Sequence, residues 1–426
     1  MNPIAVYADW DGLPAPRRLG LLHARRSGAS ELFEFEYERK ALSDPTLGMI
    51  QLEPGIGLFE GSQYPARGRE TFGVFSDSSP DRWGRMLMNR RLERDKRAGA
   101  EPANKRLFES NYLLGVHDTY RVGALRFKLN DEGPFLDDRQ GLAAPPLVKL
   151  RELEAASRSL ENDQDNTAAE GGDWIRLLIA PGGSLGGARP KASVVDTDGQ
   201  LWIAKFPSVR DEQDIGAWEY IVGSLAEACG LRVAQMDAER YASAHHCFRV
   251  KRFDRTANGR RLHFASAMTL TGHTDGDDAS TGISYLDLAQ VLITQGANTN
   301  ADLRELWSRI LFNMLVSNTD DHLRNHGFIL EPARGWHLSP AYDMNPDRYG
   351  QALKLNVSEH DNALDLDLVR SVAPIFRVPL NEADQMIEDF QGVVRQWPTL
   401  ANALGLSRRE QDEMSMAFRL AVETRH

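Results

Sequence analysis

One polar segment of the chain, residues 318–325, has the residue types and spacing of a group-transfer site. Asp320 and Asn325 lie five positions apart, with His322 between them. This is the Asp-x-x-x-x-Asn spacing of a phosphotransferase catalytic loop, in which the aspartate accepts the proton of the attacking hydroxyl and the asparagine gives its amide oxygen to Mg²⁺. The alternative is an ordinary polar loop between helices, where Asn, Thr and Asp are common. The spacing predicts a catalytic aspartate and one metal ligand.

Two further residues supply other parts of such a site. Asp343 lies eighteen residues beyond Asn325 in a proline-bounded turn, and Mg²⁺ usually takes only one or two carboxylates besides nucleotide phosphates. Lys205 closes an apolar strand, which is the position of a lysine that pairs with nucleotide phosphates. Taken alone, a strand-end lysine more often reaches for solvent. Glu219 on the following helix is a possible ion-pair partner for Lys205, although most helix glutamates are solvated. Together the residues indicate an ATP phosphoryl-transfer site that uses Mg²⁺.

A glycine-rich segment precedes Lys205. Its glycines are at positions 182, 183, 186 and 187, and backbone without a Cβ can approach a phosphate closely. Arg189 and Lys191 follow and add positive charge. The Walker and Rossmann glycine patterns are absent. Because a glycine cluster alone is more often a flexible turn, the phosphate-binding interpretation depends on the residues that follow it.

Regular elements are expected on both sides of these residues. Residues 4–10, 201–206 and 249–253 are strand-like runs, and 32–38 alternate apolar and acidic side chains. Residues 79–94 and 217–229 have helical spacing, and Gly230 ends the second helix. Residues 303–314 carry one apolar stripe, with Thr299, Asn300 and Asp302 as the expected cap. The tail, 380–424, is again helical.

The composition limits the classes of protein. The 426 residues contain 50 Lys and Arg against 61 Asp and Glu, a net charge of −11, with 42% hydrophobic and 26% charged residues. These are globular values, and the acidic balance argues against a broad nucleic-acid surface. Two cysteines exclude a disulfide framework, so we expect a reducing, cytoplasmic compartment. No apolar run approaches the roughly 20 residues of a membrane span.

Strands in front and helices behind predict an α+β chain with a two-lobed arrangement. The first lobe would be β-rich and the second mainly α-helical. We divide the chain into an amino-terminal subdomain (1–140), an ATP-binding part with the Gly-rich loop (141–280) and a helical catalytic lobe (281–426). The acidic stretch 161–173 is expected to be a solvated loop, and Trp83 a core residue. His245, His246 and Cys247 are interpreted as structural, because adjacent ligands without distant partners are poor zinc spacing.

Several ordered motifs resemble the HipA family, the toxin kinases of bacterial toxin–antitoxin pairs. They are GGSLGGARPKA at 182–192, AKFP at 204–207, VKRFDR at 250–255, NTDDHLRNHG at 318–327 and LSPAYDM at 338–344. The front segment FSDSSPDRWGRMLMNRR at 75–91 resembles the family's amino-terminal region, so the resemblance covers nearly the whole chain. The resemblance implies a two-lobed, protein-kinase-like fold with a largely helical second lobe. It also implies a serine/threonine protein kinase that uses ATP and Mg²⁺.

The resemblance also implies roles for individual residues. Asp320 matches the catalytic aspartate, Lys205 the ATP-binding lysine and Asp343 the metal-binding segment. Ser184 matches the serine that family members autophosphorylate, which switches the kinase off. With Lys205, the positions implied for ATP binding are Gly186, Gly187, Ala188, Arg189, Pro190, Lys191, Lys251, Arg252, Phe253, His322, Leu323, Arg324, Asn325, Tyr342 and Asp343.

The partners are implied by the same family. They are a HipB-like helix-turn-helix antitoxin, operator DNA bound mainly through that antitoxin, and a translation factor such as an aminoacyl-tRNA synthetase as the phosphorylated protein. An acidic toxin suits a basic antitoxin. Two departures suggest a different branch of the family from that of its best-known member. Asp321 follows the catalytic aspartate where the best-known member has glycine, and residues 261–270 replace a glutamine-containing stretch.

Two other functions stay open. The first is a catalytically weak co-repressor that acts through its antitoxin and DNA, although such a scaffold does not need Lys205, Asp320, Asn325 and Asp343 together. The second is a small-molecule kinase of similar fold, which would phosphorylate an added metabolite and no protein.

Overall fold

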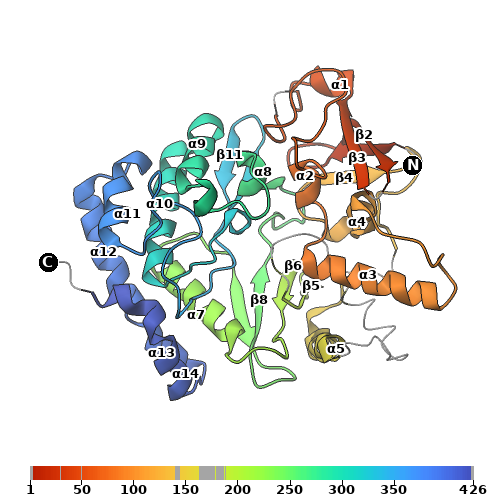
Figure 1. Cartoon of the computed structure of the whole chain (residues 1–426). Helices are drawn as coiled ribbons and strands as arrows, with labels where there is room; N and C mark the ends of the chain where they lie inside the picture. Colours follow the sequence, from red (N-terminus) through yellow and green to blue (C-terminus); the bar gives the residue numbers. More distant parts are fainter. Residues whose placement is uncertain are drawn as a thin grey trace. The chain divides into compact units, whose positions relative to one another are not determined.

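The computed structural model describes residues 3–28, 30–48, 50–139, 144–162, 178, 187 and 189–423. The chain forms two compact units, Met1–Val209 with Lys251–Ala265, and Arg210–Val250 with Ser266–His426. Both units contain helices and strands (Figure 1), which confirms the mixed α and β content predicted from the sequence. The two-lobed arrangement and the three sequence blocks, 1–140, 141–280 and 281–426, stay predictions.

An antiparallel sheet in the first unit orders its described strands as β3-β2-β1-β4. Phe33, Phe35 and Tyr37 on β3 are buried, with more exposed residues between them, so the predicted alternation is confirmed. The Phe35 ring lies 5.7 Å from that of Phe75, which covers this face of the sheet. The strands are β1 (Ile4–Ala8), β2 (Arg17–Ser27), β3 (Ser30–Tyr37) and β4 (Leu125–Lys128).

The helix expected at 79–94 is α3 (Arg82–Arg97). Asp81 caps it, because its carboxylate accepts the N–H of Gly84 at 2.9 Å. Trp83 in the first turn is buried, so its predicted core role is confirmed. Further α-helices in the described part of this unit are α1 (Arg39–Leu42), α2 (Gly73–Asp77), α4 (Glu109–Gly115) and α5 (Leu150–Asn162). A hairpin joins β5 (Lys191–Val195) to β6 (Leu201–Lys205).

The acidic stretch 161–173 begins inside α5. Glu161 accepts a hydrogen bond from the Ser208 hydroxyl at 2.7 Å and another from the N–H of Val209 at 3.0 Å. The prediction of a solvated loop is therefore wrong for Glu161, which ties α5 to the segment after β6. Residues 163–173 of the stretch lie outside the described residues.

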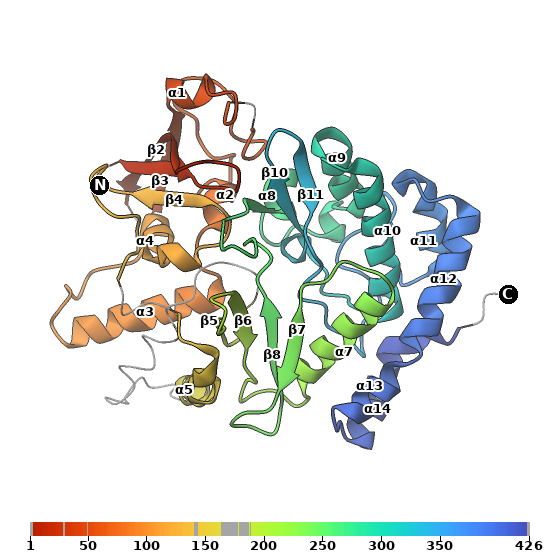
Figure 2. The ribbon, with the colours of Figure 1, turned by 180° about the vertical axis from the view of Figure 1, so that it is seen from behind.

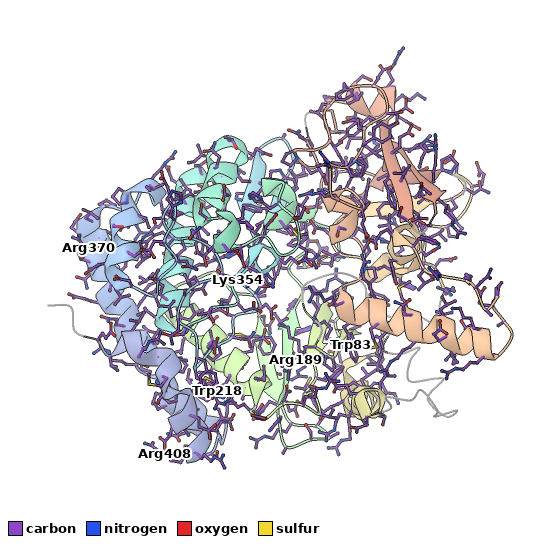
Figure 3. The ribbon with its side chains drawn as sticks, viewed as in Figure 1. Trp83, Arg189, Trp218, Lys354, Arg370 and Arg408 are labelled. Atoms are coloured by element: carbon purple, nitrogen blue, oxygen red, sulfur yellow. The ribbon has the colours of Figure 1, made fainter. Side chains whose placement is uncertain are left out.

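In the second unit, α7 (Ile215–Ala228) follows the predicted bounds closely. The Asp214 side chain caps its start, and Gly230 at φ +83° follows its end, a conformation that favours glycine. Trp218 on this helix (Figure 3) lies 5.9 Å from the ring of Trp397 and 6.1 Å from that of Phe418. An antiparallel hairpin of β7 (Met236–Glu239) and β8 (Cys247–Lys251) comes next along the chain.

Helix α10 (Thr299–Leu315) lies beside α9 (Tyr285–Gln295), α11 (Leu366–Val372) and α12 (Leu380–Val394) in the second unit (Figure 2). Its apolar stripe is buried as predicted, and the polar Arg309 and Asn313 are buried as well. The predicted cap is wrong. The residue at the N-cap position, directly before the helix, is Asn298, and its side chain makes no capping hydrogen bond. Asp302 is buried and contacts the Arg232 guanidinium at 2.5 Å instead.

The helical tail is confirmed as several consecutive helices, interrupted by turns such as Gly405 at φ +70°. No helix in the described part of the chain is both long and apolar enough to cross a membrane. Cys247 is buried, and burial raises the pKa of the Cys229 thiol to about 12. Further α-helices and strands among the described residues are α8 (Ala267–Thr271), α13 (Trp397–Ala403), α14 (Arg408–Met414), β9 (Phe264–Ser266), β10 (Gly327–Glu331) and β11 (Gly335–Leu338).

Candidate active site

Two lysines predicted to bind nucleotide face each other in the first unit. Lys191 opens β5, Lys205 closes β6, and the antiparallel register pairs them directly. Their side chains therefore lie on one face of the hairpin, and both residues are buried. Like charges at directly opposite positions destabilise a strand pair. The hairpin is thus a place where anionic groups are stabilised.

One of these anionic groups belongs to the protein. The Asp81 carboxylate lies 2.9 Å from the Lys191 ammonium. The indole N–H of Trp83 donates to the Lys191 carbonyl at 3.0 Å. The start of α3, where Figure 3 labels Trp83, therefore fixes both the side chain and the backbone of Lys191. Sequence reasoning missed Asp81, although an aspartate after Ser-Pro at a helix start is a recognisable capping signal.

The Gly-rich loop is described only in part. Gly187 has φ +87°, and its carbonyl accepts from the Lys191 ammonium at 3.4 Å. The carbonyl of Pro190 accepts the N–H of Phe206 at 2.8 Å, which fixes the loop's end to the end of β6. Ser184, Gly186 and Ala188 lie outside the described residues, so their roles stay predictions.

The segment Lys251, Arg252 and Phe253 is anchored in the first unit. The Arg252 guanidinium binds Asp254 at 2.6 Å and donates to the carbonyl of Tyr120 at 2.5 Å. Burial disfavours the charged Asp254, yet Arg252 and Arg255 outweigh it and hold the pKa of Asp254 well below its usual range. The Arg252 guanidinium is engaged in these bonds, and the nucleotide contacts of Lys251, Arg252 and Phe253 stay predictions.

The predicted catalytic turn lies in the second unit, directly after α10. Ser317 adopts a left-handed φ of +49° and turns the chain out of the helix. Asp320 is exposed, while Asn325 is buried. The Asn325 amide nitrogen donates to the Asp320 carbonyl at 3.0 Å, and the N–H of His322 donates to the same carbonyl at 2.9 Å. The structure therefore brings Asp320 and Asn325 together as the two ends of one closed turn.

The amide oxygen of Asn325 is suited to a cation. It is buried and accepts no hydrogen bond from any described residue, although buried polar atoms are normally paired. The Tyr342 hydroxyl donates to the carbonyl of Arg324 at 2.7 Å, so the residue preceding Asp343 is held against the residue preceding Asn325. An amide oxygen and a carboxylate are the hard ligands that Mg²⁺ takes. These residues therefore fit the metal predicted from the sequence.

The turn's other residues are held from several sides. Leu323 is buried, and the Arg324 guanidinium lies 3.3 Å from the Asp275 carboxylate. The Thr319 hydroxyl donates to Asp347 at 2.9 Å, so the loop after Asp343 also supports the turn. Sequence reasoning missed the support that Thr319 and Asp347 give to the turn. The two residues are 28 positions apart, and no local pattern indicates their contact.

His246, in the run His245-His246-Cys247 that is interpreted as structural, makes a contact within the second unit. The His246 ring lies 2.6 Å from the Asp214 carboxylate, the cap of α7. Among the described residues there is no cluster of three or more His, Cys, Asp or Glu side chains that could hold a metal ion. A site built from one Asn and one Asp is not such a cluster.

Comparison with known proteins identifies related sequences and folds. The family described as HipA-like C-terminal domain matches residues 183–397. Two proteins of Sinorhizobium fredii, named "Putative kinase Y4dM" and "Putative kinase Y4mE", are each 30% identical to the chain, over 34% and 38% of its length. These matches span 37% and 41% of the two relatives, so the chain matches less than half of each relative's length.

A solved structure shows a similar fold over nearly the whole chain. It is a complex of HipA with HipB and its operator DNA from Shewanella oneidensis. The TM-score is 0.64 at 17% sequence identity, and the match covers 98% of this chain and 96% of that one. At this identity the likeness concerns the fold alone.

Proposed function

The chain belongs to the HipA-like C-terminal domain family, and from that premise we propose that it is a Mg-ATP-dependent serine/threonine protein kinase. The observation that carries the proposal is the closed turn of residues 320–325. It presents an exposed carboxylate at Asp320 and, at Asn325, a buried amide oxygen that accepts no hydrogen bond from a described residue. The catalytic loop of a kinase needs two protein groups, a proton acceptor and a metal ligand.

The chemistry follows from the chain's own residues. Asp320 would accept the proton of a substrate hydroxyl while the hydroxyl oxygen forms a bond to the γ-phosphorus of ATP. The bond to the oxygen bridging the β- and γ-phosphates breaks, and ADP leaves with that electron pair. Lys191 and Lys205 would hold the phosphate charge on one face of the hairpin. Asn325 and Asp343 would hold Mg²⁺, which when bound neutralises charge on the phosphates.

Ser184 is the proposed site of autophosphorylation. A phosphate adds about −1.5 to −2 charge, and Ser184 lies seven positions before Lys191 in the sequence. The added charge would compete with ATP phosphates for the lysines, which accounts for the inhibition that the family resemblance implies.

The partners are proposed from the same premise. The similar Shewanella protein was solved with HipB and its operator DNA. We infer a HipB-like helix-turn-helix antitoxin for this chain, DNA contact mainly through that antitoxin, a cytoplasmic location, and a translation factor such as an aminoacyl-tRNA synthetase as substrate.

Mass spectrometry of phosphate incorporation tests the proposal. The wild type, Asp320→Gln, Ser184→Ala and, as a surface control on α12, Glu388→Gln are incubated with Mg-ATP. We expect phosphate on Ser184 in the wild type and the control, and none in Asp320→Gln. Full incorporation in Asp320→Gln would show that the catalytic assignment is wrong. ATP binding without turnover would favour the co-repressor, and phosphorylation of an added metabolite alone would favour the small-molecule kinase.

A further inference from the structure

The residue after the proposed catalytic aspartate, Asp321, is buried although it carries a charge. One of its carboxylate oxygens, Oδ2, accepts three hydrogen bonds from different elements. The Tyr285 hydroxyl of α9 donates at 2.6 Å and the Asn313 amide nitrogen of α10 at 2.7 Å. The His326 ring nitrogen Nε2, directly before β10, lies at 2.8 Å. Three separate elements therefore meet at one carboxylate.

The hydrogen bonds continue from Asp321 to the loop after Asp343. The Asn313 side chain that donates to Asp321 also accepts from the Asn318 amide nitrogen at 3.0 Å. The Asn318 oxygen accepts the N–H of Asn345 at 3.2 Å. The chain of contacts thus runs from Asp321 through α10 to the backbone two residues beyond Asp343. It supports both segments of the proposed site.

The environment keeps Asp321 charged but away from a substrate. Burial disfavours the carboxylate, but His326 and Tyr285 outweigh burial and hold the pKa of Asp321 below its usual range. Burial and the adjacent Asp321 raise the pKa of the Tyr285 hydroxyl well above its usual value, so it stays a donor. A carboxylate enclosed by donors does not take a proton from a substrate, unlike the exposed Asp320 beside it. Its role is to hold its neighbours.

We propose that Asp321 is a positioning residue, which fixes the turn bearing Asp320 and Asn325 to α9, α10 and the start of β10. The inference deepens the proposed kinase function and rests on it. It also gives a role to the residue that departs from the best-known family member. Positioning matters because displacing reacting groups by about 1 Å can cost about 100-fold in rate.

The test compares Asp321→Asn with a matched control, Asp302→Asn. Asp302 is also a buried aspartate of the second unit, and it contacts Arg232 and His337. For Asp321→Asn we expect kcat of phosphate transfer to fall about 100-fold while KM for ATP stays nearly unchanged. The control should keep the wild-type kcat per folded molecule. An equal fall in kcat for both variants, or a change confined to KM, would overturn the proposal.

A second variant restores the charge. Asn313→Asp combined with Asp321→Asn moves the carboxylate across the same hydrogen bond, and the new amide oxygen at position 321 can accept from Tyr285 and His326. We expect this double variant to recover at least about tenfold in kcat over Asp321→Asn. No recovery would mean that the carboxylate at Asp321 acts in another way. If Asp321→Asn does not fold, Tyr285→Phe removes one donor without a charge change and should lower kcat in the same way.

Hydrogen exchange separates this inference from the proposed function. In Asp321→Asn, amides of residues 317–326 should exchange faster than in the wild type and in Asp302→Asn, because the turn loses its anchor. Unchanged exchange would overturn the positioning role even in an active enzyme. If the wild type transfers no phosphate, the kinase proposal is wrong, whereas the exchange rates still decide whether Asp321 holds the turn.

Discussion

The Asp81 carboxylate lies 2.9 Å from the Lys191 ammonium, and both residues are buried in the first unit. Asp81 also caps the start of α3, so one carboxylate both begins a helix and neutralises a lysine of the proposed phosphate site. The amino-terminal segment at 75–91 therefore helps to build that site.

The Asp81–Lys191 pair is testable by a double-mutant cycle. Asp81→Asn keeps a good helix cap but removes the Asp81 charge from the buried Lys191 ammonium, so we expect a loss of about 3 kcal/mol in the free energy of unfolding. Lys191→Met should be less costly, and the double variant should cost about 2 kcal/mol less than the sum of the two. Denaturant unfolding measures all four proteins. Simple additivity would contradict the pairing.

Asn325 is predicted to serve both the turn and the metal. Asn325→Ala removes both functions, whereas Asn325→Asp keeps an oxygen ligand but loses the donor to the Asp320 carbonyl. For Asn325→Ala we expect the Mg²⁺ concentration for half-maximal activity to rise at least about tenfold. Binding of Mn²⁺ with ADP, followed by electron paramagnetic resonance, should weaken in parallel. Asn325→Asp should bind the metal and still turn over slowly, and wild-type turnover in that variant would refute the role of the donor.

Gly350 allows close approach to the catalytic turn. A Cβ at this position would lie 2.4 Å from Cγ2 of Thr319, and the Thr319 hydroxyl is already bonded to Asp347. Gly350→Ala should therefore cost about 1–3 kcal/mol in stability and lower kcat. Gly392 in α12 is the control, because a Cβ there meets nothing within 4 Å. Gly392→Ala should stabilise the chain by about 0.5–1 kcal/mol. Equal thermal shifts for both variants would contradict the crowding at Thr319.

Glu53 makes stability depend on pH. Burial raises its pKa to about 7, although the N–H of Val74 donates to its carboxylate at 2.8 Å. Because the folded pKa is above the unfolded value of 4.5, its contribution to stability is complete below pH 4.5 and is lost as pH rises through 7. The loss is about 3 kcal/mol. Relative to the wild type, Glu53→Gln should become more stable from about pH 5 to about pH 8 in denaturant unfolding. Glu36→Gln, at an exposed site of β3, should show no such trend.

Local sequence patterns were enough to predict those elements that are determined by residues close to them in the sequence. The alternation in β3 places Phe33, Phe35 and Tyr37 inside, as a two-residue period requires. The bounds of α7 follow from Asp214 and Gly230, a cap and a stop that act on their own helix. The pair Asp320 and Asn325 also belongs here, because a turn closed over five positions is a local structure.

Residues whose partners lie far away were not predictable in this way. Helix α10 was expected to have one buried face, yet Arg309 and Asn313 on its polar side are buried too. Arg309 donates to the carbonyl of Ser339, and Asn313 to Asp321. Helical periodicity predicts that polar residues face solvent. It cannot distinguish an exposed polar face from a buried one whose side chains bond to residues of the proposed site. For the same reason the sequence shows Asp321 only as a departure from the glycine of the best-known family member. In the structure, residues of three elements bond to its carboxylate.

The two cysteines give the chain a useful chemical property. A thiol reacts as its thiolate, and Cys229 with a pKa of about 12 has almost none at neutral pH, while Cys247 is buried. Maleimide dyes should therefore label the native protein slowly. A cysteine introduced at Val148 in one unit or Val422 in the other, 79% and 70% exposed, can then carry a fluorophore selectively. The wild-type background would permit single-molecule fluorescence studies without first removing any native residue.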